Sequence, residues 1–475
     1  MSKLSLFIIF TQLISASSLA TTLKLSPQKA VNQALEASDK IKQIRIKKQQ
    51  ARIIELRATG PYVFGASLDY SLESTQAESL SGFSNEQDDT HMYSFGFQKK
   101  FSSRTLTSLS FNRISKDSVL SSFTSNLNLP DQQTQDVVNF RFEQDLWQNS
   151  FGSIERQQIQ NARELFKSAS MQEKEEMEAY LIEVMTLFWS SYLEKRSFEE
   201  AIESRTRYKK LLKTVKKKKR LGFVAPGELA RTHAEYKLQD HLVKQTSLAY
   251  LKSVQALATI LNYENIDDID FEIKENIPTL PLLKDINLDQ LRPLRILNIV
   301  HKNSSRNINI AKSQGRPILK FVGSVSSTGL ESERGEAFSE MTSLIHPTQY
   351  VGLNLKFTMG SDLLDGEVQF AKYEAEIARL NIIQNKKQLK DQIDYLTHAA
   401  SANHILAKGA IELIKHRTNS MKEISRAYYQ GRTDIQNLIL SYSSLSQALI
   451  NHIRAIGNYH LSLNQLAAAR DELIK

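Results

Sequence analysis

The side chains that most often bind metals or catalyse reactions are thinly spread along this chain. Its ten histidines and eight methionines do not cluster, and the lack of cysteine excludes disulfides and thiolate catalysis. His398, His404 and His416 are six and twelve residues apart, so they do not stack at short range on one helical face. The motifs HExxH and GxSxG and a phosphate-binding glycine loop are also absent. We therefore expect no metal site, no cofactor and no enzymatic activity.

The N-terminus has the features of a secretory signal. Lys3 precedes an apolar run over residues 4–14, and small and polar residues follow as far as Ala20. This pattern predicts a signal peptide over residues 1–20, because the apolar run is too short to cross a bilayer as a helix. No later segment offers about 18 uninterrupted apolar residues, which excludes a helical membrane protein. A secreted chain of this kind is either soluble or a β-barrel.

A basic run is the most distinctive charge feature of a chain whose formal net charge is +9. Residues 209–220 contain no acid and eight basic side chains: Lys209, Lys210, Lys213, Lys216, Lys217, Lys218, Lys219 and Arg220. One interpretation is the solvated face of a coiled coil, and the other is a docking surface for an acidic protein. We do not expect nucleic acid as a partner, because the run lacks interleaved aromatic residues and belongs to a secreted chain.

Several segments alternate apolar with small or polar residues. Over residues 62–73 one face carries Tyr62, Phe64, Ala66, Leu68, Tyr70 and Leu72. The pattern returns near residues 93–101, 107–111, 138–143, 319–325 and 351–359. This period of two predicts strands that lie between lipid and a wet lumen, with Leu353, Leu355 and Phe357 facing lipid. The polar stretches 76–90, 116–134 and 331–347 are predicted to be exposed loops.

Two other stretches predict unusually long helices. Residues 153–221 contain no glycine or proline, which allows about 100 Å of continuous helix at 1.5 Å per residue. Residues 367–430 are interrupted only by Gly409. Helices of this length cannot be stabilised inside a compact domain, so we expect them to pack as coiled coils. A further helix is predicted over residues 26–59, capped by Ser26.

The order of predicted elements occurs twice. LSPQKAVNQAL from Leu25 matches LRPLRILNIVH from Leu291. Each copy closes its strands in a break that contains glycine, at residues 151–152 and 365–366, just before its long helix. The first copy carries an extra hairpin over residues 91–114. The pattern therefore predicts an internal repeat with unequal copies.

Each long helix ends in a glycine turn. Gly222 lies in RLGFVAPGEL and Gly431 lies in YQGRTDIQNL. We expect both glycines to have positive φ, a conformation that glycine adopts without steric cost at the end of a helix.

These segments together resemble the TolC-like outer-membrane efflux proteins, the outer membrane factors. The opening LSPQKAVNQALEASDKIKQIRIKKQQ looks like the first periplasmic helix of that family, and LGFVAPGEL and YYQGRTDIQNLILSYSSL look like its two tip turns. The resemblance implies a mixed, mainly α fold with two internal repeats, in which a trimer shares a long coiled-coil periplasmic tunnel and a transmembrane antiparallel β-barrel. The family commonly has twelve strands in that barrel. Six strands from each of three chains would instead give eighteen, which suits a wide aqueous barrel.

On this basis the chain is predicted to consist of eight segments. They are the signal peptide (1–20), a periplasmic helix (21–60), barrel strands (61–150) and a coiled-coil helical hairpin (151–262) of the first repeat, an equatorial linker (263–290), and a periplasmic helix (291–315), barrel strands (316–365) and a coiled-coil helical hairpin (366–475) of the second repeat.

The resemblance also implies a closing link at the periplasmic mouth. In the family, a tyrosine and an arginine beside the second turn pair with an aspartate beside the first. Tyr428 matches the tyrosine and Glu228 the aspartate, while Thr433 stands at the arginine position with Arg432 next to it. The positions where the family places acids after the second turn hold Asn437 and Leu440, so no anionic entrance ring is expected.

The implied function is that of a passive exit duct in the outer membrane, with its tunnel extending into the periplasm. It would belong to a tripartite efflux pump or a type I secretion system, gated at its helical tips. Its partners would be outer-membrane lipid, an inner-membrane transporter and a periplasmic adaptor (membrane fusion) protein, with the basic run as a docking surface. The alternative is a soluble periplasmic coiled-coil scaffold or adaptor protein, which the alternating strands and the duplicated layout disfavour.

Overall fold

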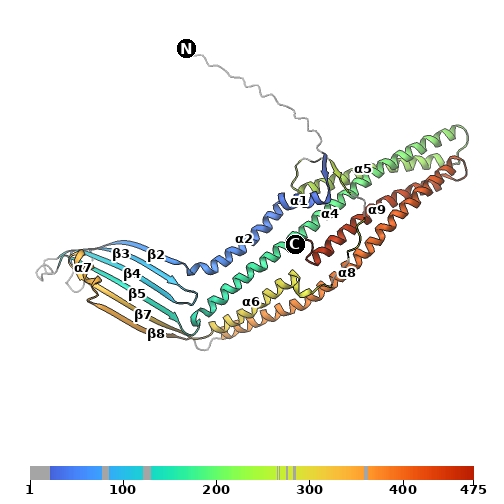
Figure 1. Cartoon of the computed structure of the whole chain (residues 1–475). Coiled ribbons are helices and arrows are strands. Elements are labelled where there is room, and N and C mark those ends of the chain that lie inside the picture. Colours follow the sequence, from blue (N-terminus) through green and yellow to red (C-terminus); the bar gives the residue numbers. More distant parts are fainter. Residues whose placement is uncertain are drawn as a thin grey trace, which may run out of the picture. The chain divides into compact units, whose positions relative to one another are not determined.

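The computed structural model of the chain describes residues 22–76, 85–120, 130–264, 266, 268–273, 277–281, 285–357 and 362–474. The signal peptide predicted over residues 1–20 lies outside these described residues. The chain divides into two compact units (Figure 1). Unit 1 comprises residues 1–46, 173–292 and 386–475, and unit 2 comprises residues 47–172 and 293–385.

Unit 2 contains an antiparallel sheet of six strands. The strands are β2 (Phe64–Thr75), β3 (Gln87–Lys100), β4 (Leu106–Val119), β5 (Gln132–Asp145), β7 (Ile318–Glu331) and β8 (Pro347–Lys356). They lie in chain order, so β2 and β8 form the two edges (Figure 1). The hairpin predicted over residues 91–114 corresponds to β3 and β4, and both strands lie inside the sheet between β2 and β5.

The strand register sorts side chains onto one apolar and one polar face. Partners directly across from one another share a face. One such row is Leu68, Phe95, Phe111 and Val138. The adjacent row, which points to the other side, is Ser67, Gly96, Ser110 and Asn139. The alternation seen in each separate segment is therefore a property of the whole sheet.

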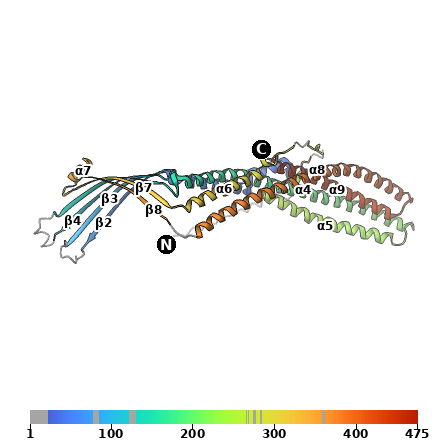
Figure 2. The same cartoon turned by 90° about the horizontal axis from the view of Figure 1, so that it is seen from below.

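The stretch 331–347, predicted to be an exposed loop, contains a helix. Helix α7 (Arg334–Thr342) follows β7 and buries Ala337 and Met341. Figure 2 shows α7 at one end of the sheet. The sequence prediction was wrong because the segment RGEAFSEMT is mostly polar and only two of its side chains are fully packed.

Besides α7, four helices of the described residues contribute to unit 2. They are α2 (Asp39–Thr59), α4 (Ser153–Arg220), α6 (Arg292–Gln314) and α8 (Asp362–Tyr429). Gly366 lies within α8, so the break predicted at residues 365–366 is wrong and the helix begins earlier. The break at residues 151–152 is present: Gly152 has φ of +74°, and a Cβ there would lie 1.8 Å from the Ser102 carbonyl oxygen. An isolated glycine such as Gly366 only weakens a helix, whereas Gly152 is required by the close approach of another segment.

Unit 1 is built on a helical framework with a small parallel sheet. Its further elements are α1 (Pro27–Ala37), α5 (Glu228–Ile260), α9 (Ile435–Ala469), β1 (Thr22–Leu25) and β6 (Asp268–Phe271). Strands β1 and β6 pair in parallel, within the stretches predicted as a helix (21–60) and a linker (263–290). The main core packs Phe188, Val184 and Val254 of the long helices against Ile269 of β6. None of the helices in the described part of the chain is long and apolar enough to cross a membrane.

The helix predicted over residues 26–59 is in fact two helices, which separate at Ser38. The hydroxyl of Tyr180 lies 2.6 Å from Ser38 Oγ and donates to the carbonyl of Ile260 at 2.8 Å. Ser38 Oγ also accepts from the N–H of Lys40 at the start of α2. The side chain of Ser38 thus satisfies the N–H of Lys40, which a continuous helix would have bonded internally.

A buried ion cluster in unit 1 was not recognised in the sequence. The guanidinium of Arg292 lies 3.1 Å from Glu175, 2.7 Å from Glu178 and 3.1 Å from Asp471. Asp471 also accepts from the Arg292 backbone N–H at 2.7 Å, and Glu178 accepts from the N–H of Ile474. The cluster therefore joins α4, the start of α6 and the C-terminal end of the chain.

This cluster predicts a pH dependence of stability. Burial raises the pKa of Glu175 to about 7, and although Arg292 lowers it, the carboxyls of Asp471 and Glu178 raise it further. The folded chain therefore binds more protons than the unfolded chain between about pH 4.5 and pH 7. The contribution of Glu175 to stability is present in full below about pH 4.5 and is lost as the pH rises through about 7.

We expect the Glu175→Gln variant to lose this dependence when thermal unfolding is followed by circular dichroism. Glu183→Gln, which changes an exposed acid on the same helix, is the matched control. A wild-type chain whose stability rises between pH 5 and pH 7 relative to Glu175→Gln would contradict the assignment.

Candidate functional site at the two helical turns

The two glycine turns have the same backbone geometry. Gly222 and Gly431 have φ of +80° and +75°. At the first turn, the N–H of Gly222 donates to the backbone carbonyl of Lys219, and the N–H of Phe223 donates to the backbone carbonyl of Lys218. The second turn repeats this pattern: the N–H of Gly431 donates to the carbonyl of Tyr428, and the N–H of Arg432 donates to the carbonyl of Ala427. Both are Schellman motifs, in which a glycine of positive φ lets the chain satisfy the last helical carbonyls before it reverses.

A hydrogen bond joins the two turns within one chain. The hydroxyl of Tyr428, at the end of α8, donates to Glu228 Oε1 at 2.7 Å. The other carboxylate oxygen of Glu228 accepts from the N–H of Ala225, which fixes this side chain at the first turn of α5. Tyr428 is only 3% exposed. Burial, together with the carboxylate that accepts its proton, raises the pKa of Tyr428, so the hydroxyl remains a donor at neutral pH.

Lys218 differs from the rest of the basic run. Its Nζ lies 4.2 Å from the centroid of the Tyr428 ring, within the range of a cation–π interaction. The same atom donates to the backbone carbonyl of Tyr428 at 3.3 Å. Lys216, Lys217, Lys219 and Arg220 are exposed. The sequence predicted a single basic run, but the structure assigns one of its members to the contact between the turns.

The remaining predicted residues occupy the second turn without making the predicted ion pair. Arg432 is exposed, and the side chain of Thr433 accepts from the Asn437 amide. Among the described residues of one chain there is no ion pair between Glu228 and Arg432. Arg231, which the sequence analysis did not single out, instead donates to Gln436 at 3.0 Å and adds a second link between the turns.

An apolar cluster lies directly behind these polar contacts. It combines side chains of α4, α8 and α9: Tyr208, Leu211, Val215, Tyr428, Ile435, Leu438 and Tyr442. The rings of Tyr208 and Tyr442 meet edge to face, with their centroids 5.6 Å apart. The cluster holds the two helical hairpins together, and the Tyr428–Glu228 bond closes its outer end.

Two cavities open beside the first turn. One, of about 400 Å³, is lined by groups from both turns, including Lys218, Glu228, Tyr428 and Thr433. The other, of about 660 Å³, is lined mainly by apolar residues such as Val224, Leu229 and Ala230, together with His233 and a basic rim of Lys216 and Lys219.

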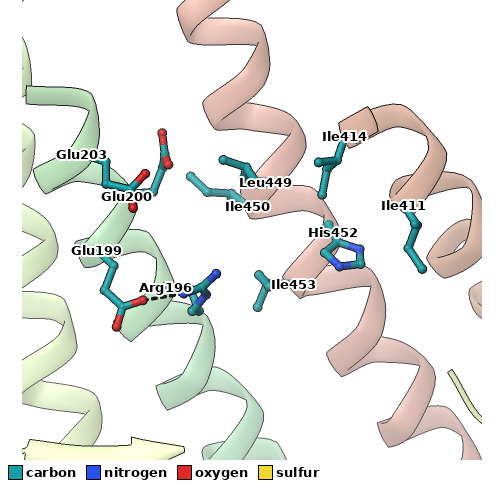
Figure 3. Close-up of a pocket in the computed structure, with 10 residues that line it drawn as sticks. All are labelled: Arg196, Glu199, Glu200, Glu203, Ile411, Ile414, Leu449, Ile450, His452 and Ile453. Atoms are coloured by element: carbon teal, nitrogen blue, oxygen red, sulfur yellow. Dashed lines mark hydrogen bonds and ion pairs between the residues drawn. The ribbon is translucent and has the colours of Figure 1, made fainter. Parts of the chain in front are cut away.

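A third cavity, of about 380 Å³, lies between α4, α8 and α9 (Figure 3). One side carries Glu199, Glu200 and Glu203, and the other carries isoleucine and leucine side chains such as Ile411 and Ile453. The acids are engaged: Glu199 pairs with Arg196 at 2.7 Å, and Glu200 pairs with Arg207. The cavity is therefore a packing gap between an acidic and an apolar helix face.

One carboxylate group in the described residues could geometrically hold a metal ion. Its members are Glu175, Glu178 and Asp471, with ligand atoms within 4.8 Å of one another. The guanidinium of Arg292 already supplies a positive charge to all three. This arrangement fits an ion cluster better than a metal site.

Comparison with known proteins identifies the fold. No family model and no curated protein matches the sequence. Solved structures match nearly the whole chain. The structure of CusC, reported in connection with folding and transmembrane channel formation, has a TM-score of 0.69 at 10% identity, covering 94% of this chain and 93% of that one.

Two further structures give similar values. The outer membrane protein VceC of Vibrio cholerae has a TM-score of 0.66 at 10% identity and covers 93% of this chain and 95% of its own. The CmeC outer membrane channel of Campylobacter jejuni has a TM-score of 0.66 at 14% identity and covers 94% of this chain and 86% of its own. The likeness extends over both units of the chain, and the resemblance inferred from the sequence is confirmed at the level of the fold. The chain has the fold of the outer-membrane channel proteins.

Proposed function

We propose that the chain is one protomer of a trimeric outer-membrane channel. The observation that carries this proposal is the six-stranded sheet, which has one apolar face, one polar face and two free edges. In lipid, every backbone N–H and C=O must be bonded, so a sheet can stand in a bilayer only when its edges are closed. Pairing β2 of one chain with β8 of the next would close them.

Three chains would build a barrel of eighteen strands. The hairpin β3–β4 is hydrogen-bonded on both sides, so all six strands of a chain belong to the wall. A barrel of sixteen to eighteen strands leaves an aqueous channel, whereas a barrel closed by six strands alone has no room for one. The polar face would line this channel and the apolar face would meet lipid.

An exposed apolar stripe on α8 supports the association of chains. The stripe consists of Phe370, Tyr373, Ile377, Leu380 and Ile383, each at least half exposed in one chain. These residues follow one another at intervals of three or four, so they share one face of the helix. A long helix with such a face is expected to bury it against another helix, here from a neighbouring protomer.

The channel would be a passive exit duct of a tripartite efflux pump or a type I secretion system. An inner-membrane transporter would supply energy, and a periplasmic adaptor would dock at the helical tips. The exposed members of the basic run and the basic-rimmed apolar cavity beside Lys216 support an acidic docking partner. A soluble periplasmic scaffold is the less favoured alternative, because it would leave the apolar face of the sheet exposed to water.

We infer that the two turns form the gate of this duct. The Tyr428–Glu228 bond and the Lys218 contact tie the end of α8 to the end of α4 and the start of α5. Threefold symmetry would place three such links around the periplasmic mouth. Opening would then require the tips to separate, starting from this outermost contact.

Fractionation tests the function as a whole. The protein should be recovered from the outer membrane and should run as a detergent-resistant trimer that dissociates on heating. It should also form ion-conducting pores in planar bilayers. Recovery as a soluble periplasmic monomer would refute the channel and favour the scaffold.

The facing of the sheet predicts opposite effects for two adjacent residues of β8. Leu355 belongs to the apolar face and Lys356 to the polar face. Leu355→Arg should lower the free energy of unfolding because it places a charge in hydrocarbon, by about 2–4 kcal/mol near the bilayer midplane and by about 0–1 kcal/mol near an interface. Lys356→Leu should fold normally when both variants are refolded into lipid vesicles and titrated with urea. A folding defect in Lys356→Leu but not in Leu355→Arg would reverse the assignment.

The gate predicts a change in conductance. A hydrogen bond to a charged group is worth about 1.5–3 kcal/mol, so losing three of them should shift the gate towards its open state. Glu228→Ala combined with Tyr428→Phe should raise the single-channel conductance without loss of the trimer. Lys217→Gln, which neutralises an exposed member of the basic run, should leave closure intact. Unchanged conductance in the double variant would show that other contacts seal the mouth.

A further inference from the structure

Helix α7 packs tightly against the apolar face of the sheet. Its Ala337 carbonyl comes so close to β7 that a Cβ on Gly329 would lie 2.0 Å away. Ser327, two residues before Gly329, donates from its hydroxyl to the Met341 carbonyl at 2.8 Å. Both strand residues belong to the apolar face. Ser327 pairs with Val138 of that face, and Gly329 pairs with Asp136, which lies two residues before Val138 and so points to the same side. The backbone of α7 therefore packs directly against β7, which is possible only because the strand carries small residues there.

An ion pair lies on that same face, next to α7. Arg113 and Asp136 are cross-strand neighbours joined by two hydrogen bonds of 2.7 and 2.6 Å. Asp136 is fully buried, and Arg113 also donates to the Arg334 carbonyl in the first turn of α7. A charge pair on a lipid-facing surface is costly unless protein covers it. The helix provides this cover.

The position of α7 along β7 matches the edge of a bilayer. A tilted strand crosses the hydrocarbon in about 9–11 residues. Counted from Ile318, at the end of β7 nearest α6, this length reaches about residues 326–328, and α7 rests on Ser327 and Gly329. Tyr70 and Tyr93 occupy the same cross-strand row as Arg113, as expected for the aromatic girdle of a membrane interface.

We propose that α7 is an interfacial helix, which lies between the outer end of the barrel wall and the headgroup region of the lipid. Phe338 anchors it there. The ring of Phe338 packs edge to face with Phe111 on the apolar face and is still 48% exposed. Thr342, one turn further along, lies on the same side of the helix, whereas Glu336 is about 200° around it. The proposal rests on the proposed function, because it takes the apolar face of the sheet to face lipid.

The absence of cysteine allows single fluorescent labels to test this placement. The variants are Phe338→Cys and Thr342→Cys on the proposed lipid side of α7, and Glu336→Cys on its other side. Leu355→Cys and Asn354→Cys report the two faces of β8. Each labelled protein is reconstituted in phosphatidylcholine vesicles with lipids spin-labelled near the headgroup or deep in the acyl chain, and separately with iodide in the buffer.

We expect labels at positions 338 and 342 to be quenched most by the shallow lipid probe and weakly by iodide. The label at position 336 should be quenched mainly by iodide. Thr342→Cys keeps the ring of Phe338. If Phe338→Cys does not fold, the label at position 342 alone therefore tests whether this side of α7 faces lipid. Iodide quenching at 338 and 342, with lipid quenching at 355, would refute the interfacial helix and leave the channel standing. Lipid quenching at 354 but not at 355 would instead refute the facing of the sheet.

A matched pair of glycine substitutions tests whether α7 packs closely against Gly329. In the Thr342→Cys background, Gly329→Ala should displace α7 and increase quenching by iodide. Gly323→Ala lies on the same face of β7, where an added Cβ meets only ordinary contacts of 3.5 Å or more, and should leave quenching unchanged. Equal quenching in the two variants would contradict a close seating of α7 on Gly329.

Discussion

The pairing of backbone groups is the constraint on which this structure depends. Among the residues that the structure describes, each inner strand of the sheet is bonded on both sides, whereas β2 and β8 are each paired on one side only. In water such edges could be solvated, whereas in lipid they could not. The side chains impose a second condition, because the apolar face needs lipid and the polar face needs water. The closed barrel of several chains that we propose would satisfy both conditions at once. The association of chains would then follow from the requirements of the strands themselves.

The long helices also need partners, but for their apolar side chains and not for their backbone. An isolated helix satisfies its own backbone, so α4 and α8 can be long without any sheet. Their apolar residues, however, need partners. In unit 1 the partners come from the same chain, through the core around Phe188 and the cluster around Tyr208. In unit 2 the stripe from Phe370 to Ile383 remains exposed in one chain. In the described part of a single chain, the two sheet edges and this helix face of unit 2 therefore stay uncovered.

Periodicity predicted the elements that repeat a simple pattern, and it failed where one or two residues decide the structure. The alternation around Leu68 and Phe95 predicted strands, and the absence of helix breakers predicted α4 closely. Helix α7 was missed because its packing depends on Gly329 and on two apolar side chains in a polar segment. The contact between Tyr428 and Glu228 was expected only from the family resemblance, since 200 residues separate them. The cluster around Arg292 joins residues as distant as Glu175 and Asp471, so no local pattern could indicate it.

The contacts at the turns differ in strength, which bears on how the proposed gate would open. The cluster behind the turns buries several large side chains, each worth about 1.5–3 kcal/mol, and these hold the hairpins together along their length. The outer contacts are polar: the Tyr428–Glu228 and Arg231–Gln436 hydrogen bonds, and the cation–π interaction and hydrogen bond that Lys218 makes with Tyr428. Separating only the final turns would break these contacts and leave Leu211, Leu438 and their neighbours packed. If the two turns form the proposed gate, the least costly opening movement would separate only the final turns, with water replacing the polar contacts and the apolar cluster acting as the hinge.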